Sequence, residues 1–270
     1  MDKEMEMRMI ILAKPYGDHS NRLIQAIHYE AYCLDRGVSF FNITFDDMAQ
    51  HYPSLKIGRR LKAIRLLSRC MLRLGLTSII EDVQQISDLD NAATSMVTLV
   101  GGWDFRVHDL TRKHQDHFAR MYSIDESLVG HNSLAKQIAE WKSDGQTVVG
   151  VHIRRGDYRE FMDGRFYYLD FVYEAKIREI AMLCAARGSQ ARFVLFSNEP
   201  SSVCISEGLD CAVSRNDWHI DHWLMSQCDF LVGPPSTFTM WASYIGKTPY
   251  FHISDPKAPI DLSSFCYCHG

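Results

Sequence analysis

Two adjacent arginines, Arg154 and Arg155, follow residues 148–153, a β-branched segment with the length and composition of a buried strand. Guanidinium groups match phosphate oxygens bidentately and stay charged at any working pH. Gly156 lets the backbone approach a ligand closely, and Asp157 can hold one guanidinium in place. The pattern indicates a phosphate-binding turn, and an ordinary arginine–aspartate ion pair at the surface is the alternative interpretation.

A second group of polar residues stands where another short strand gives way to a helix. Residues 229–232 have strand character, a Gly-Pro-Pro turn follows, and Ser236 and Thr237 open a helical segment. The first turn of a helix offers free N–H groups and a positive dipole, and hydroxyl groups add donors, so an anion fits there. The alternative is that Ser236 only caps the helix, which is the commoner use of such a serine.

Strand and helix alternate from about residue 147 to residue 253, and these elements must position both groups. The pattern predicts strands at 148–153, 192–196, 229–232 and 248–253, and helices at 169–187, 219–227 and 236–245, with Gly188 and Gly246 ending two of them. Such alternation predicts a parallel sheet with helices on both faces, in which ligands bind beyond the carboxyl ends of the strands.

The first half of the chain repeats this pattern less clearly. Strands are predicted at 9–13, 38–45, 79–80 and 97–100, and Ser20 is predicted to cap a helix that runs to Arg36 and ends at Gly37. We therefore expect an α/β protein with two Rossmann-like domains, residues 1–145 and 146–270, joined by a short linker.

Three motifs, in this order, resemble the superfamily of α-1,2-, α-1,6- and O-fucosyltransferases. They are His152-x-Arg154-Arg155-x-Asp157, the turn Ser197-Asn198-Glu199, and the block from Asp221 to Phe238. Residues 233–242 are most similar to the bacterial α-1,2 pattern, whereas residues 221–232 look at least as much like the α-1,6 branch. The resemblance covers residues 148–247 and extends weakly to residues 17–25.

The resemblance implies a GT-B fold with two Rossmann-like domains facing across a cleft, GDP-fucose as donor, inversion at the anomeric carbon and no metal. Carried over position by position, the donor-binding residues are His152, Arg154, Arg155, Asp157, Asn198, Asp221, Ser236, Thr237 and Phe238. Arg155, with Arg154 as the alternate, would grip the β-phosphate, and Asp221 would accept hydrogen bonds from guanine. His152 would lie beside the phosphates and ribose, and residues 236–238 would hold the diphosphate.

This assignment agrees with the chemistry of glycosyl transfer. Departure of GDP places negative charge on the β-phosphate, and fixed cations and helix N–H groups can neutralise it in place of a metal ion. We therefore count Arg155 as catalytic and expect no cofactor beside the donor substrate.

The general base is harder to assign. In the α-1,6 branch a glutamate shortly after the arginine motif resembles this base, but the matching position here is Met162, which cannot take a proton. Glu160 and Asp163 flank it and are the candidate catalytic carboxylates, with solvated loop charges as the alternative. His19 and Asp18 in the first half are comparable candidates.

Composition bounds the remaining functions. The 270 residues carry a net charge of -4, which argues against a general nucleic-acid binder. No run of about 18 or more apolar residues occurs, so we expect no transmembrane segment. The eight cysteines form no disulfide framework or zinc clip, which indicates a reducing, cytoplasmic compartment.

Three further patterns have ordinary explanations. A basic run interleaved with leucines, residues 56–73, could contact the inner face of an anionic membrane, although a solvated helix face is the more common interpretation. Asp88-Leu89-Asp90 matches the DxD pattern of metal-dependent transferases, but two aspartates in a polar connection are frequent by chance. His219 and His222 are spaced like metal ligands without an obvious third partner.

The favoured function is transfer of fucose from GDP-fucose to a glycan hydroxyl, with α-1,2 linkage preferred over α-1,6. A transferase that uses another nucleotide sugar is the enzymatic alternative, because pocket shape sets the sugar. A nucleotide- or carbohydrate-binding protein that has kept the fold without the base is the non-enzymatic one.

Overall fold

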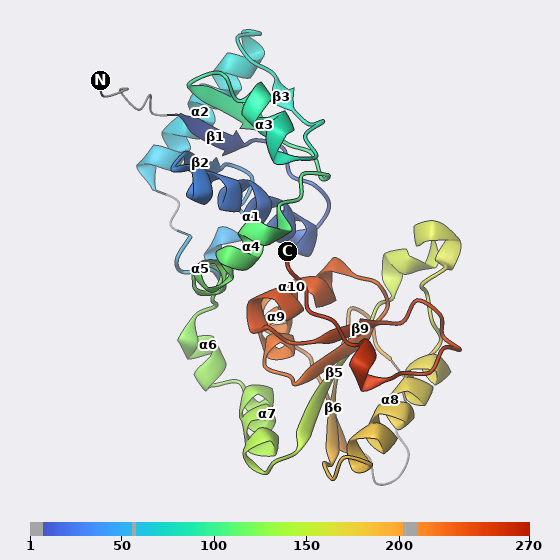
Figure 1. Ribbon diagram of the computed structural model, residues 1–270. Coiled ribbons are helices and arrows are strands. Elements are labelled where there is room, and N and C mark those ends of the chain that lie inside the picture. Colours follow the sequence, from blue (N-terminus) through green and yellow to red (C-terminus); the bar gives the residue numbers. More distant parts are fainter. Residues whose placement is uncertain (1–7, 56–57, 202, 204–209) are drawn as a thin grey trace. The chain divides into compact units, whose positions relative to one another are not determined.

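The computed structural model describes residues 8–55, 58–201, 203 and 210–270 (Figure 1). The chain forms two compact units, one running to Ser123 with His269–Gly270 added, the other spanning Ile124–Cys268. The division falls before the expected boundary at residue 145, because α7 (Ser133–Ser143) packs Leu134, Ile138 and Trp141 into the core of the second unit. In the described part of the chain, none of the helices has the length and apolar character needed to cross a bilayer.

The first unit is built on a four-stranded parallel sheet of order β2-β1-β4-β3. The strands are β1 (Met9–Leu12), β2 (Ser39–Asn42), β3 (Ile79–Ile80) and β4 (Val97–Val100). The helices are α1 (His19–Arg36), α2 (Arg59–Arg73), α3 (Ile86–Ala92), α4 (His108–Lys113) and α5 (Gln115–Met121), with the 3-10 turn η1 (Ala49–His51). The expected strands are all present, each close to its predicted position.

Helix α1 shows how the local sequence sets the ends of an element. The Asp18 carboxylate accepts a hydrogen bond from the His19 N–H at 2.9 Å, so the N-cap is Asp18 and the prediction of Ser20 was wrong by two residues. Ser20 is instead buried within the first turn. Gly37 ends the helix at φ 66°, the left-handed conformation that glycine adopts without steric cost.

The second unit contains a five-stranded, all-parallel sheet of order β7-β6-β5-β8-β9. The strands are β5 (Thr147–Ile153), β6 (Ala191–Ser197), β7 (Asp210–Val213), β8 (Phe230–Gly233) and β9 (Tyr250–His252). The helices are α6 (Glu126–Gly130), α7, α8 (Asp170–Ala185), α9 (Trp218–Ser226) and α10 (Thr237–Gly246), with 3-10 turns η2 (Gly156–Arg159), η3 (Phe161–Gly164) and η4 (Leu262–Ser264). Strand β7 is an addition to the predicted elements.

Both faces of this second sheet are covered, as the alternation of strand and helix predicts. Val149, Val151 and Ile153 of β5 pack in one apolar cluster with α8, whereas Val148 packs in another with α7, α9 and α10. Figure 1 shows α8 on one side of the sheet and the other three helices on the opposite side. Successive side chains of β5 therefore point to two different helical layers.

Helix α10 begins and ends at residues with specific geometry. The Ser236 hydroxyl accepts a hydrogen bond from the Phe238 N–H at 3.2 Å, which confirms Ser236 as the cap. Gly246 is the last helical residue, and the left-handed position after it is Lys247 at φ 53° and not glycine. Gly246 is required for another reason: a Cβ atom there would lie 2.4 Å from the backbone oxygen of Ser226 in α9.

Candidate functional site

The second sheet has a topological switch point between β5 and β8. The chain leaves β5 towards β6 and leaves β8 towards β9, so the two connections run in opposite directions along the sheet. In open α/β sheets this divergence creates the crevice in which ligands bind, beyond the carboxyl ends of the two strands. The arginine motif follows β5 and the Gly-Pro-Pro turn follows β8, so both predicted groups come to this point.

The alternation of β5 continues into the turn and separates the two arginines. His152 lies on the side of α9 and α10, where its Nδ1 atom is 2.9 Å from the Thr239 hydroxyl. Ile153 faces the α8 side. The backbone stays extended at Arg155, with φ -124° and ψ -153°, so Arg154 follows His152 and Arg155 follows Ile153.

Arg154 lies beside the turn that opens α10. Its guanidinium forms an ion pair with Asp157 at 2.8 Å and sits 5.3 Å from the centre of the Tyr158 ring. The Tyr158 hydroxyl donates to the backbone oxygen of Pro235 at 2.6 Å and also interacts with the Ser236 hydroxyl. These contacts hold the Arg154 side chain in place. The side chain is still 24% exposed, so a ligand can reach it.

A layer of aromatic and imidazole rings lies against this helix start. The Phe238 ring lies 5.1 Å from His152 and 4.0 Å from His222, measured between ring centres, and the Ser236 N–H donates to Nε2 of His252 at 3.4 Å. Burial, followed by the charges of Arg154 and His252, lowers the pKa of His152 to about 3. Burial likewise lowers the pKa of His252 to about 4. The imidazoles of His152 and His252 are therefore neutral at working pH, whereas Arg154 carries a fixed positive charge.

Arg155 lies on the opposite side and is 6% exposed. Its backbone N–H donates to the Asn198 side-chain oxygen at 2.8 Å, and its guanidinium donates to the Tyr168 backbone oxygen and to the Asp170 carboxylate. The rings of Tyr167 and Tyr173 lie 5.1 Å and 5.7 Å from the guanidinium carbon. Arg155 is therefore held within a network that joins the arginine turn to β6 and α8.

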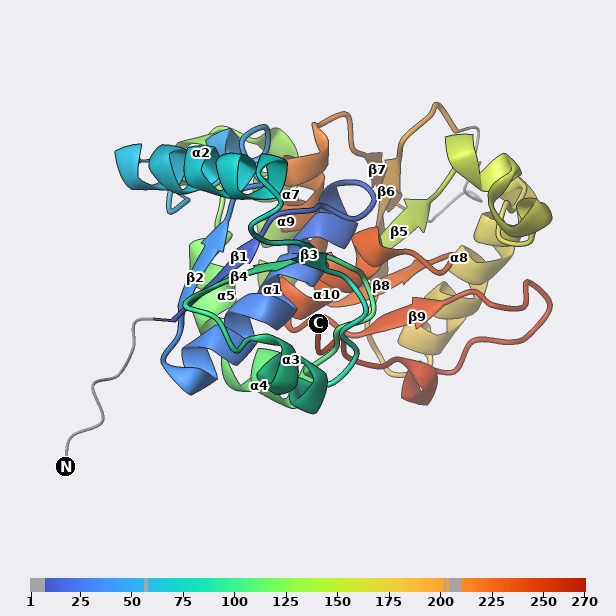
Figure 2. The ribbon, with the colours of Figure 1, turned by 90° about the horizontal axis from the view of Figure 1, so that it is seen from above.

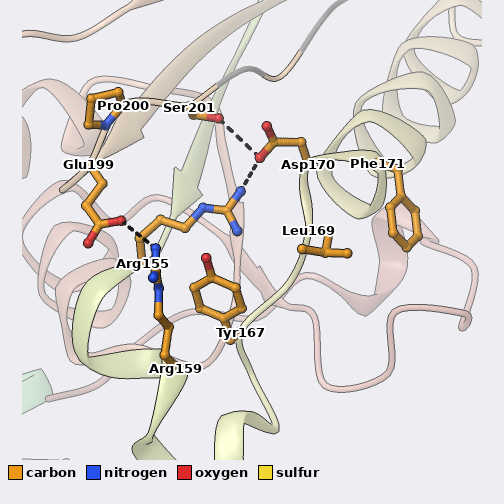
Figure 3. Close-up of a pocket in the computed structure, with 9 residues that line it drawn as sticks. All are labelled: Arg155, Arg159, Tyr167, Leu169, Asp170, Phe171, Glu199, Pro200 and Ser201. Atoms are coloured by element: carbon orange, nitrogen blue, oxygen red, sulfur yellow. Dashed lines mark hydrogen bonds and ion pairs between the residues drawn. The ribbon is translucent and has the colours of Figure 1, made fainter.

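An open pocket of about 550 Å³ lies beside this network (Figure 3). Its lining residues are Arg155, Arg159, Tyr167, Leu169, Asp170, Phe171, Glu199, Pro200 and Ser201. Figure 3 shows the Arg155 guanidinium directed at Asp170 and the Arg159 guanidinium directed at Glu199, at 3.5 Å. The positive charges of this pocket are thus matched by carboxylates of the protein.

Asp221 lies in the first half of α9 and is 8% exposed. It accepts a hydrogen bond from the Ser214 hydroxyl, just after β7. Burial, only partly offset by the Ser214 hydrogen bond, raises the pKa of Asp221 to about 7. Its neighbour His222 contacts Phe238, so the carboxyl belongs to the helix that flanks the switch point.

The candidate bases lie in the loop after the arginine motif, Glu160 between η2 and η3 and Asp163 within η3. Glu160 and Asp163 are both exposed, and no hydrogen bond or ion pair joins either to the ring layer within the residues that the structure describes. Met162 and Asp163 have φ angles of 50° and 56°, a conformation that residues with a side chain rarely adopt. Strained backbone of this kind is concentrated at functional sites, which supports this loop as part of the candidate site.

The first unit carries an aromatic pair at the carboxyl edge of its sheet. The rings of Tyr16, after β1, and Trp103, after β4, are stacked with centres 4.8 Å apart and planes 19° from parallel. The Arg106 guanidinium carbon lies 4.0 Å from the centre of the Trp103 ring. Tyr16 remains 45% exposed, and Asp18 and His19 follow it in the same turn.

A single buried amide holds the two loops of this pair together. Gln25 of α1 is 1% exposed; its oxygen accepts from the Tyr16 N–H at 3.1 Å. Its nitrogen donates to the backbone oxygens of Gly102 at 2.6 Å and Lys14 at 3.2 Å. The position of the aromatic pair is therefore fixed by hydrogen bonds that satisfy a buried side chain.

The DxD pattern has structural roles in the first unit. Asp88 accepts hydrogen bonds from the backbone N–H groups of Gln84 and Gln85 at the start of α3. Asp90 pairs with Arg36 at 2.9 Å. Each carboxylate is thus engaged by its own partners.

Sequence reasoning missed residues that connect the motifs. Tyr158 links Arg154 to the start of α10, and His252 contacts the Ser236 N–H from the end of β9. His252 could have been found, because it falls at the carboxyl end of a predicted strand. Asp170, the partner of Arg155, carries no pattern that distinguishes it from other charges at the start of a helix.

Comparison with known proteins bears on this arrangement. A family model described as glycosyl transferase family 11 matches residues 42–259. Among solved structures, an arginine-to-lysine mutant of Arabidopsis thaliana FUT1 in complex with GDP is similar with a TM-score of 0.55 and 11% identity, covering 99% of this chain and 75% of that chain. POFUT1 in complex with GDP-fucose gives a TM-score of 0.37 and 12% identity, over 94% and 72% of the two chains. No curated protein sequence matches the chain. The parallel α/β units and the likeness to FUT1 confirm the expected GT-B type of fold.

Proposed function

The chain belongs to glycosyl transferase family 11 and is a glycosyltransferase, and we propose that it transfers fucose from GDP-fucose to a hydroxyl of a glycan. The GDP bound to the structurally similar FUT1 supports a guanine nucleotide as part of the donor. The motifs similar to bacterial α-1,2-fucosyltransferases favour an α-1,2 linkage over α-1,6, and an inverting reaction.

One observation carries this proposal: at the switch point of a parallel sheet, Tyr158 contacts both the Arg154 guanidinium and the turn that opens α10. Arg154 reaches the start of α10 through Tyr158, and Ser236 and Thr237 supply hydroxyl groups there. A diphosphate binds such a combination through bidentate guanidinium contacts and through the free N–H groups of the first helical turn. The same groups stabilise the charge that develops on the β-phosphate as GDP leaves.

The ring layer supports the same role. Phe238, His152 and His222 can exclude water from one side of the helix start, and electrostatic attraction strengthens where water is excluded. The neutral imidazoles of His152 and His252 add no competing positive charge, so the diphosphate is drawn to Arg154 and the helix.

Arg155 and Asn198 are proposed to hold the turn that carries Arg154 in position. Their hydrogen bonds tie the residue after Arg154 to β6 and α8, which fixes the direction in which Arg154 points. This proposal exchanges the roles that the sequence suggested, with Arg154 contacting the phosphate and Arg155 serving as a positioning residue.

Asp221 is proposed to bind the guanine base. A carboxylate can accept hydrogen bonds from the guanine N1–H and from its exocyclic amine together, as the family resemblance implies. The polar surroundings of Asp221 and its place beside the ring layer support this role.

The reaction is proposed to need no metal ion, because the cation and helix N–H groups can neutralise the departing diphosphate themselves. Transfer should then continue in the presence of EDTA. A loss of activity in EDTA would instead direct attention to Asp88 and Asp90.

The acceptor is proposed to bind at the aromatic pair of the first unit. Aromatic rings can stack on the apolar face of a sugar, so the pair can hold one sugar of the acceptor glycan. The exposed ring of Tyr16 and the Asp18 carboxylate would contact it.

The proposed general base is Glu160 or Asp163 in the strained loop after the arginine motif. Both carboxylates are exposed and can approach a substrate hydroxyl once an acceptor is bound. Asp18 and His19 are the alternatives in the first unit. Glu160→Gln and Asp163→Asn should each be measured for transfer and for GDP binding. The general base is the residue whose variant still binds GDP but no longer transfers the sugar.

A cytoplasmic location is proposed as well. The cysteines in the described residues are all free thiols, namely Cys33, Cys70, Cys184, Cys211, Cys228, Cys266 and Cys268, and Cys204 lies outside those residues. Free thiols in this number suit a reducing compartment.

The function is tested by incubating the protein with GDP-fucose, GDP-mannose or UDP-glucose in the presence of EDTA and measuring release of the nucleotide. Release from GDP-fucose alone supports the proposal. Release from another donor only would assign a different sugar, and GDP binding without release would indicate a binding protein of the same fold.

A further inference from the structure

Helix α2 presents an apolar stripe to solvent. Ser68 is its one buried residue in the structure, whereas Leu66, Leu67 and Leu74 just after its end are 66%, 54% and 71% exposed. Ala63 and Cys70 are exposed as well and fall on the same helical face at a repeat of about 3.6 residues. The helix lies at the periphery of the first unit (Figure 2). Exposed apolar surface that is continuous along a helix indicates an interaction site.

Positive side chains border this stripe on both sides. Lys62, Arg69 and Arg73 follow one edge at helical spacing, and Arg60 lies at the other edge with its guanidinium 5.0 Å from the Phe41 ring. Arg65 is different, because it points inward and pairs with Asp46. Lys56, the first cation of the predicted basic run, lies outside the described residues.

These cations have no compensating acidic partners. No aspartate or glutamate occurs between Asp47 and Glu81 in the sequence, although the whole chain has a net charge of -4. Among the residues that the structure describes, Arg69, Arg73 and Lys62 form no ion pair. Positive charge is therefore concentrated on this helix, although the protein as a whole carries a net negative charge.

We propose that α2 binds the surface of an anionic lipid bilayer and lies parallel to it. The leucines would enter the boundary between headgroups and acyl chains, and the flanking cations would contact lipid phosphates. An anionic bilayer is the partner that satisfies both features at once. A nucleic acid would leave the leucines exposed, and a second copy of the chain in a twofold dimer would bring the same cations together.

The test is co-sedimentation of the whole protein with vesicles of phosphatidylglycerol, with vesicles of phosphatidylcholine as the neutral control. Binding is expected on the anionic vesicles and should weaken as salt is added, because exposed charges are screened. Each of Arg69→Gln and Arg73→Gln should lower the partition coefficient by roughly fivefold, the equivalent of about 1 kcal/mol per cation. Arg215→Gln removes an exposed arginine of the second unit and should leave binding unchanged.

The apolar half of the surface has its own variant. Leu66→Ser should lower the partition coefficient by about tenfold, since a leucine side chain contributes roughly 1.5 kcal/mol or more when buried. Leu128→Ser, at a leucine 42% exposed in the second unit, is the matched control and should have no effect. Circular dichroism checks that every variant is folded, which the exposure of these side chains favours.

Three results would overturn the proposal. Equal binding to neutral and anionic vesicles would remove the role of the cations, and unchanged binding of Arg69→Gln and Leu66→Ser would place the contact elsewhere. Light scattering that shows a dimer disrupted by Leu66→Ser, without vesicle binding, would assign the stripe to a second copy. None of these measurements needs donor or acceptor, so they are independent of the proposed transferase reaction.

Discussion

Replacing Arg154 by alanine should remove most transfer while leaving the protein folded. Its side chain is 24% exposed and pairs with that of Asp157, which is 61% exposed, so water can replace the lost partner at little cost in stability. If Arg154 is the cation that stabilises the departing diphosphate, its loss removes one preorganised charge, which typically lowers kcat by roughly 10²–10³. The affinity for GDP should fall with it, and Arg154→Lys should recover part of both.

Arg155 provides the matched comparison one residue away. Its guanidinium is 7% exposed, and alanine there would leave the Asp170 carboxylate, 24% exposed, and the Tyr168 backbone oxygen without their donor. Breaking a buried pair typically costs roughly 3–5 kcal/mol, and the partial exposure of Asp170 points to the lower end of that range. Arg155→Ala should therefore lower the free energy of unfolding first and affect turnover through the position of the turn.

Two measurements on both variants separate these effects. Denaturant unfolding should show Arg154→Ala near the wild-type midpoint and Arg155→Ala clearly below it, whereas GDP titration calorimetry should show the larger loss for Arg154→Ala. The reasoning is refuted if Arg154→Ala turns over GDP-fucose at the normal rate. It is also refuted if Arg155→Ala keeps full stability and loses GDP binding, because the phosphate would then bind on the α8 side.

Four further predictions concern Asp221, Tyr16 and Gly246. The pKa of Asp221 is raised to about 7, and binding of guanine needs the ionised carboxylate. The affinity for GDP should therefore fall as the pH drops below about 7. A GDP affinity that calorimetry finds independent of pH would contradict this role. Between pH 3.8, the ordinary carboxyl pKa, and about 7, Asp221 is protonated in the folded chain and ionised in the unfolded chain. The free energy of unfolding should therefore decrease as the pH rises through this window. Asp221→Asn should remove this contribution to the pH dependence of stability. Tyr16→Ala should raise the KM for the glycan acceptor by about three- to tenfold with GDP affinity unchanged, and an unchanged KM would place the acceptor elsewhere. Gly246→Ala should destabilise by roughly 1–3 kcal/mol in chemical unfolding, because its Cβ would meet the Ser226 oxygen, whereas Gly130→Ala, with open space around it, should be neutral.

The elements of the second unit could be predicted closely because its strands are short apolar runs separated by turn residues. Where the prediction failed, a competing interaction decides. Asp18 caps α1 in place of Ser20, since its carboxylate reaches the first free N–H of the helix and Ser20 is turned into the core. Helix α7 joins the second unit because Trp141 and its apolar neighbours fit that core, which the charge pattern of the linker does not reveal.

Part of the geometry of the candidate site could be predicted from the sequence. Residues at the ends of predicted strands, such as His152 and Ser236, do meet at the switch point, because the carboxyl ends of parallel strands share one edge of the sheet. The contacts between them depend on Tyr158 and His252. Predicting these contacts requires the register of β5 against β8 and of β8 against β9. Such register is set by long-range packing, which a single sequence does not display.

The two arginines show why a motif read as one unit can divide in three dimensions. The side-chain period of a strand is two residues, so two neighbours that follow β5 without a bend must face different helical layers. The layer that holds α10 contains the Gly-Pro-Pro turn and the open helix start, and the layer that holds α8 contains Asp170 and the tyrosines. The Arg154 guanidinium pairs with Asp157 three residues along its own turn, whereas the Arg155 guanidinium is buried against Asp170 of α8. We therefore propose that strand parity decides which arginine stays available to an anionic ligand, with Arg155 holding the turn in place.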